Sequence, residues 1–173
     1  MADGILKVGQ ITNSAGSGNI TIGSGVTVNV NRAAFLVVRT SDQSTTSATY
    51  TKIQGDTVIL DTDSCYDTST YKFTPTVAGK YFVFCSTRLK DDANDLLQWG
   101  AKIDKNGSQY KENYSKGTAQ ERGATEISTI VDMNGSSDYL EFYAWGVAGS
   151  GNPTLQGDLN NKSSSFGAYK LGA

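Results

Sequence analysis

The sequence predicts an all-β protein, a sandwich or barrel of about ten short antiparallel strands. Its 19 glycines, with many Ser, Thr and Asn residues but only 2 prolines, are typical of strands joined by tight polar turns. From residue 33 onward, apolar segments alternate with turn signals about every ten residues. Two Asn-Gly dipeptides, at 106–107 and 134–135, are strong turn signals. Together these observations indicate an all-β domain.

Each predicted strand is a run of β-branched or aromatic residues that ends in turn residues. The predicted turns are Gln54-Gly55-Asp56, a corner at Pro75 and Gly79, a hairpin turn at 105–107, a polar loop that contains Gly117 and Gly123, and Asn134-Gly135. The strands are expected at residues 33–40, 49–53, 57–61, 71–74, 80–89, 97–104, 109–114, 125–133, 138–147, 154–159 and 165–171.

The strand expected at residues 80–89 is apolar on both of its faces. Phe82 and Phe84 point to one side, and Tyr81 and Val83 point to the other, because side chains alternate along a strand. Residues 139–145 show the same two-sided pattern. A strand of this kind suits a place with one face in the core and the other against a neighbouring subunit, so we expect an oligomer.

Length and composition exclude several classes of protein. The 173 residues fit one domain with a short appendage. Because the sequence has no histidine, the commonest general base and zinc ligand is missing, and most hydrolase mechanisms are excluded. A formal charge of −2 without a dense Lys or Arg block argues against nucleic-acid and membrane partners. We therefore expect no enzymatic activity and no cofactor.

The N-terminus and the cysteines indicate where the protein is made. Residues 1–8 have neither the basic nor the apolar region of a signal peptide, and no apolar run reaches transmembrane length. Cys65 and Cys85 are too few for a disulfide framework and are expected to be reduced thiols. We expect synthesis in a cytoplasm without secretion.

Residues 1–31 differ from the rest and are predicted to form an extended, β-prone arm. They contain no aromatic residue, and short alternating apolar stretches are separated by Gly, Ser, Thr and Asn. A disordered tail is the alternative. Fully extended, about thirty residues reach about 100 Å. The apolar residues expected to contact a partner surface are Ile5, Leu6, Val8, Ile11, Ile20, Ile22, Val26 and Val28.

Residues 32–173 resemble the globular head of the complement C1q family, which is close to the tumour necrosis factor jelly roll. The likeness lies in residues 35–38 (FLVV), in residues 66–84 (YDTSTYKFTPTVAGKYFVF) and in residues 165–169 (SFGAY). The resemblance implies a ten-stranded jelly roll and a compact homotrimer. The residues expected in the core or the trimer interface are Phe35, Phe73, Tyr81, Phe82, Phe84, Trp99, Phe142, Trp145, Phe166 and Tyr169.

The arm differs from the collagen-like stalk of animal C1q proteins. Residues 4–8 (GILKV) and 18–23 (GNITIG) instead resemble the glycine-punctuated N-terminal segments of fibre and decoration proteins of tailed bacteriophages. This resemblance implies a virion protein, either a decoration (cement) protein bound to the major capsid protein or a tail-fibre head that binds a host receptor or glycan. A lectin-like or signalling head without a virion is the third hypothesis, and the missing secretion signal counts against it.

Two acidic clusters and a set of aromatic residues are candidate binding sites. Asp61, Asp63 and Asp67 have oxygen ligands at a spacing that can bind calcium, although the loop lacks the Gly and terminal Glu of a dedicated calcium loop, and a solvated turn is the alternative. Asp91, Asp92 and Asp95 are expected to satisfy turn backbone. The aromatic set could stack on carbohydrate or fill the core and interface; its members are Trp99, Trp145, Tyr110, Tyr114, Tyr139 and Tyr143.

Overall fold

The structure, a computed structural model, describes residues 33–171 of the chain. The chain divides into two units, Met1–Asn31 and Arg32–Ala173. The predicted contact residues of the arm therefore lie outside the described residues; they are Ile5, Leu6, Val8, Ile11, Ile20, Ile22, Val26 and Val28. Within the described residues no helix is long and apolar enough to cross a membrane.

The described chain forms thirteen strands, five of which are only two residues long. They are β1 (Ala34–Val38), β2 (Gln43–Ser44), β3 (Thr51–Lys52), β4 (Thr57–Asp61), β5 (Tyr66–Asp67), β6 (Lys72–Phe73), β7 (Gly79–Lys90), β8 (Leu96–Lys105), β9 (Ser108–Gln120), β10 (Arg122–Met133), β11 (Leu140–Ala148), β12 (Thr154–Leu155) and β13 (Ser165–Lys170). The predicted all-β jelly-roll fold is confirmed. The number of strands exceeds the predicted ten because the chain makes short pairings, such as β2 and β5, between its turns.

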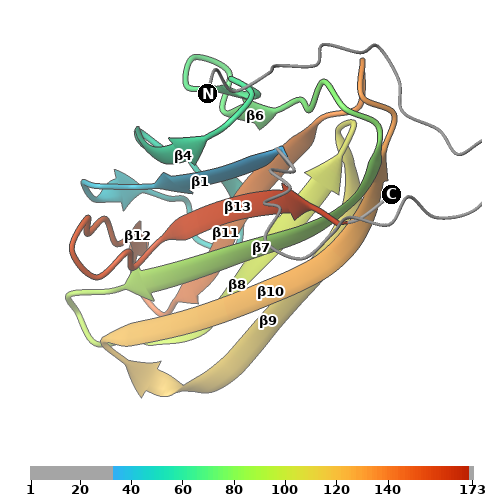
Figure 1. The fold of residues 1–173 in the computed structure, drawn as a ribbon. Coiled ribbons are helices and arrows are strands. Elements are labelled where there is room, and N and C mark those ends of the chain that lie inside the picture. The colour runs from blue at the N-terminus through green and yellow to red at the C-terminus, as the bar shows by residue number, and fades with distance from the viewer. Residues whose placement is uncertain (1–32, 172–173) are drawn as a thin grey trace, which may run out of the picture. The chain divides into compact units, whose positions relative to one another are not determined.

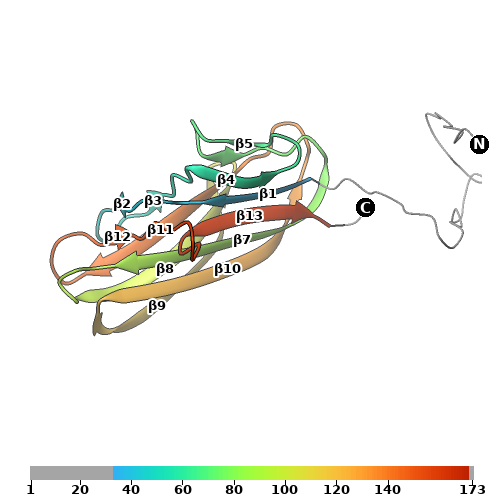
Figure 2. The same cartoon turned by 60° about the vertical axis from the view of Figure 1, so that its left-hand side comes forward.

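The strands form two antiparallel sheets that lie face to face (Figures 1 and 2). The seven-stranded sheet has the order β2-β12-β7-β13-β1-β4, and β10 pairs with the other edge of β7. The six-stranded sheet has the order β5-β6-β11-β8-β9, and β3 also pairs with β11. The chain thus passes from the seven-stranded sheet to the six-stranded sheet between β10 and β11.

Aromatic rings from both sheets fill the space between them. Phe35 of β1 stacks on Phe73 of β6 with ring centroids 4.1 Å apart, and Phe166 of β13 stacks on Phe142 of β11 at 4.4 Å. Tyr81 of β7 lies edge-on to Phe73 at 5.7 Å. All five side chains are almost completely buried, and each contributes a large apolar area to the core.

The predicted loop around Gly117 and Gly123 is wrong, because β9 and β10 continue through it with only one residue between them. The two glycines are strand residues that make room for the indole of Trp99. A Cβ atom at Gly123 would lie 2.2 Å from Trp99 Cδ2, and one at Gly117 would lie 2.8 Å from Trp99 Cη2. The indole donates a hydrogen bond to the carbonyl of Ala124 (3.1 Å). The two glycines are therefore needed for the close approach of the Trp99 ring to the strands and not for a turn.

The two Asn-Gly dipeptides have different roles. Asn106 and Gly107 both have positive φ (53° and 76°) and form the tight turn of the β8–β9 hairpin, as predicted. Asn134 and Gly135 do not close a hairpin, because β10 and β11 belong to different sheets. Gly135, at φ 71°, lies against the backbone of Ala78, where a Cβ atom would be 2.2 Å from the amide nitrogen. This dipeptide turns the corner between the sheets.

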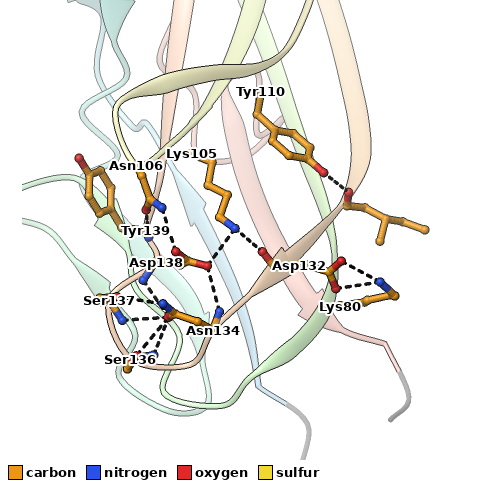
Figure 3. Close-up of polar contacts among 11 residues, drawn as sticks. Lys80, Lys105, Asn106, Tyr110, Asp132, Asn134, Ser136, Ser137, Asp138 and Tyr139 are labelled. Atoms are coloured by element: carbon orange, nitrogen blue, oxygen red, sulfur yellow. Dashed lines mark hydrogen bonds and ion pairs between the residues drawn. The ribbon is translucent and has the colours of Figure 1, made fainter.

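A polar network ties these two turns together (Figure 3). The side-chain oxygen of Asn134 accepts hydrogen bonds from the amides of Ser137 (2.9 Å) and Asp138 (3.0 Å). The carboxylate of Asp138 pairs with Lys105 (2.9 Å) and accepts a hydrogen bond from Asn106 (2.8 Å). Because Lys105 and Asn106 belong to the hairpin, the network fixes the corner to the end of the six-stranded sheet.

Replacing Gly123 by Ala should destabilise the protein by about 1–3 kcal/mol, because the new methyl group overlaps the ring of Trp99 and must displace it. Denaturant unfolding of the variant and the parent measures this difference. Thr118→Ala, on the exposed part of the neighbouring strand, is the control and should change the stability by less than about 0.5 kcal/mol. Equal stability of Gly123→Ala and the parent would contradict the position given to Trp99.

Candidate functional site

The outer face of the seven-stranded sheet is the main candidate for a functional surface. In β7, Tyr81, Val83 and Cys85 are buried and face the core. Phe82 and Phe84 therefore point away from the core and are half-buried. The strand therefore carries large, partly exposed apolar side chains on the outer face of the sheet.

Pairing between strands extends this apolar surface across the sheet. Two neighbouring rows run from strand to strand: Leu60, Leu36, Gly167, Phe84 and Ser128 form one, and Ala34, Tyr169, Phe82 and Ile130 form the other. We call the large side chains of these rows the apolar strip: Leu36, Leu60, Phe82, Phe84, Ile130 and Tyr169. Ile130 is 51% exposed, and Leu60 and Tyr169 are each 46% exposed. The strip covers β4, β1, β13, β7 and β10.

The side chains of the apolar strip are held in place by their neighbours. The rings of Phe82 and Tyr169 lie 5.3 Å apart. The ring of Phe84 lies over Gly167, where a Cβ atom would be 2.7 Å from Phe84 Cζ. Beside Phe82 and Phe84 is a hollow of about 590 Å³ that is also lined by other residues of β7, β10 and β13 and by Lys162, which precedes β13. A preorganised surface of this kind loses little side-chain entropy when it is covered.

Charged residues border the apolar strip at the end where β7 begins. Lys80 and Asp132 form an ion pair with an N–O distance of 2.8 Å across β7 and β10, next to the row of Phe82 and Ile130 (Figure 3). Both side chains are more than half exposed, so the pair contributes little to folding stability. It marks the polar rim of the strip.

The predicted core and interface residues divide among four places. Phe35, Phe73, Tyr81, Phe142 and Phe166 lie in the core. Phe82, Phe84 and Tyr169 belong to the apolar strip, Trp99 packs at the edge of the core, and Trp145 lies on the outer face of the six-stranded sheet. Leu36, Leu60 and Ile130 also belong to the apolar strip but were not among the predicted interface residues. The outward orientation of Leu36 and Ile130 could have been predicted from the sequence, because each alternates with core residues of its own strand.

The first acidic cluster serves the local backbone. The carboxylate of Asp61 accepts hydrogen bonds from the amides of Cys65 (3.0 Å) and Tyr66 (2.9 Å). Asp67 accepts bonds from the hydroxyl and the amide of Ser69 and from the hydroxyl of Thr70, and these bonds lower the pKa of Asp67 to about 2. The third member, Asp63, has no role in this arrangement that we identify. Among residues 33–171 there is no group of three acidic, Cys or His side chains suited to a metal ion.

The second acidic cluster also stabilises a loop. The carboxylate of Asp91 accepts a hydrogen bond from the amide of Asp95 (3.0 Å), and the carboxylate of Asp95 accepts one from the hydroxyl of Ser150 (2.7 Å). The neighbouring carboxyl group of Asp95, together with burial, raises the pKa of Asp91. The neighbouring carboxyl group of Asp91, with the hydrogen bond from Ser150, lowers the pKa of Asp95. The two carboxyl groups join the 91–95 loop to the 149–150 loop.

Both cysteines are free and buried. Burial raises the pKa of the Cys85 thiol, and burial is also the main cause that raises the pKa of Cys65. A protonated, buried thiol is a poor nucleophile. The arrangement therefore gives neither cysteine the activation that catalysis needs.

The aromatic candidates for carbohydrate binding do not form one surface. Tyr114, Tyr143 and Trp145 point outward from the six-stranded sheet. Tyr110 instead donates a hydrogen bond to the carbonyl of Ile130 in β10 (2.9 Å; Figure 3). Tyr139 lies beneath the ammonium group of Lys72, 3.9 Å from the ring centre, and Trp99 is at the edge of the core.

This chain matches known proteins in structure and not in sequence. Neither a protein-family model nor a curated protein sequence matches this chain. Solved structures do match. Murine APRIL has a TM-score of 0.61, with 82% of this chain and 100% of that chain covered. Eiger TNF from S. frugiperda has a TM-score of 0.59, with 82% and 93% covered.

The globular domain of zebrafish complement 1qA has a TM-score of 0.55, with 82% of this chain and 98% of that chain covered. Sequence identity is 11% in all three comparisons. At this level the similarity establishes the fold and not a shared ligand. Residues 33–171 thus adopt a C1q/TNF-like jelly roll.

Proposed function

We propose that this chain is a non-enzymatic structural protein of a tailed-bacteriophage virion, with a homotrimeric head (residues 32–173) that residues 1–31 attach to the capsid. The observation that carries the proposed homotrimeric head is the apolar strip. Virion location and synthesis in a host cytoplasm belong to the proposal; they are supported by the resemblance of residues 4–8 and 18–23 to phage fibre and decoration segments.

The apolar strip suits contact with further copies of the same chain. Monomeric proteins rarely expose apolar surfaces that are continuous over several strands. Covering Ile130, Tyr169 and Leu60 removes apolar area from water at a gain of about 25 cal/mol per Å². A strip alone would serve a dimer as well as a trimer. The fold supports three copies, because C1q and TNF-family heads are trimers.

Capsid decoration is proposed before a tail-fibre role because residues 1–31 carry short alternating apolar stretches that suit contact with a partner surface. About thirty residues reach about 100 Å when extended, which is enough to lie across neighbouring capsid subunits. Three arms in one trimer add multivalent contacts, so that weak single contacts give strong attachment. The tail-fibre head that binds a host receptor or glycan is the second candidate. The outward-facing aromatic rings of the six-stranded sheet favour it.

Replacing Ile130 by Lys should separate the trimer into folded monomers, because three buried ammonium groups in an apolar contact are costly. Light scattering during size-exclusion chromatography should show the mass fall from three times 18.4 kDa to 18.4 kDa. Leu159→Lys, at a residue that is 45% exposed but lies outside the strip, is the control and should remain trimeric. A monomeric parent, or a trimeric Ile130→Lys variant, would contradict the proposed contact.

Deleting residues 1–31 should leave a folded trimer that no longer attaches to capsids, because the described core lies entirely after these residues. Capsids stripped of accessory proteins, and separately host cells, are incubated with the full chain and with the shortened chain. Saturable binding of the full chain to capsids alone is the expected result. Equal capsid binding by both chains would show that the arm is not the anchor, and binding to cells alone would support the tail-fibre role.

A further inference from the structure

The outer face of the six-stranded sheet carries ordered side chains that neither the core nor the apolar strip uses. In β11, Leu140, Phe142 and Ala144 face the core. Tyr143 and Trp145 therefore face outward. This face lies on the side of the sandwich opposite to the apolar strip (Figures 1 and 2).

Three aromatic residues form a platform at one level of this face. Strand pairing places Trp145 of β11 opposite Gly100 of β8, and Gly100 opposite Tyr114 of β9. Because Gly100 has no side chain, the rings of Tyr114 and Trp145 approach to 5.5 Å in an edge-to-face arrangement, with an angle of 65° between their planes. The ring of Tyr50, which precedes β3, lies 6.2 Å from the ring of Trp145. We call Tyr50, Tyr114 and Trp145 the aromatic platform; Tyr114 is 55% exposed.

Charged groups lie beside the platform and neutralise one another. Lys102 pairs with Asp104 at 2.8 Å, and its ammonium group lies 4.6 Å from the ring centre of Tyr50. Lys52 pairs with Glu141, whose side chain is only 7% exposed. Burial, and next the neighbouring carboxyl group of Glu112, raise the pKa of Tyr50. Charged donors and acceptors in fixed positions make strong, directional hydrogen bonds.

The chemistry of this face selects among ligands. Beside the rings this face carries charged side chains and, on β11, the half-buried Val147, so it offers little aliphatic area for a lipid or a large apolar protein contact. Lys102 pairs with Asp104, and Lys52 and Lys72 both pair with Glu141, so these ammonium groups are largely compensated and attract a polyanion weakly. A ligand that fits has an apolar flat face for the rings and hydroxyl groups for the charged residues. Pyranose sugars have both.

We infer that the aromatic platform, with the charged row of Lys102 and Glu112 beside it, is a binding site for a neutral oligosaccharide whose pyranose rings stack on Trp145 and Tyr114. The inference does not depend on the trimer, because the residues involved come from one copy of the chain. It would give a virion protein of either proposed type a contact with glycans on a cell surface.

The two tryptophans of the chain allow a direct test. The protein is labelled with 5-fluorotryptophan, and its fluorine resonances are assigned with the Trp99→Phe variant. The full chain is then titrated with cellotriose, chitotriose, maltotriose and mannotriose. At least one of these sugars should shift the Trp145 resonance saturably and leave the Trp99 resonance unchanged. Addition of about 0.5 M NaCl should not weaken the binding, since the ligand is neutral.

Variants separate the site from general effects on folding. Tyr114→Ala should bind the active sugar about tenfold more weakly, because a stacking ring is lost. Tyr110→Ala is the matched control, since this tyrosine of the same strand is 46% exposed but turns toward β10; it should bind like the parent. Ile130→Lys should also bind like the parent, even if it is monomeric. Thermal melting confirms that each variant is folded.

Several results would overturn the inference. They are the absence of any shift of Trp145 with all four sugars, an equal loss of binding in Tyr114→Ala and Tyr110→Ala, and binding of heparin alone that disappears in salt. Failure of the trimer or of capsid attachment would leave these measurements unaffected. The two proposals can therefore fail separately.

Discussion

Everything else in this domain depends on the stacking of aromatic rings across the sandwich. Phe35 on Phe73 and Phe166 on Phe142 each join one sheet to the other, at 4.1 and 4.4 Å. Because side chains alternate along a strand, burying these rings fixes which side chains face outward. The residues available for function are thus determined by the residues that make the core.

The two outer faces that result have different chemistry. Apolar side chains continue over five strands of the seven-stranded sheet, which suits contact with the same chain. Rings and compensated charges alternate on the six-stranded sheet, which suits a small polar ligand. A protein that must assemble and bind at the same time benefits from this separation, because each face can be covered without hiding the other.

The open edge between β9 and β10 is closed by side chains and not by backbone pairing. Trp99 fills the space between the sheets there and bonds to Ala124, and Tyr110 bonds to Ile130. Gly117 and Gly123 give the indole its space. At the end of this edge, the network around Asn134 and Asp138 fixes the corner through which the chain passes from one sheet to the other. These contacts hold β10, and with it Ile130, in a defined position.

The sequence by itself determined the all-β class, most of the strands and the alternation of Tyr81 and Val83 with Phe82 and Phe84, because these depend on local pattern and turn chemistry. Only the tertiary structure decided which of the two sides is the core. It also decided that Gly117 and Gly123 lie in strands and that Asn134-Gly135 turns between sheets. Pairings between residues far apart in the chain bring Leu60, Leu36 and Ile130 into one strip. Such pairings also bring Tyr50 next to Trp145 and Tyr114. They follow from strand register and packing, which no local sequence pattern contains.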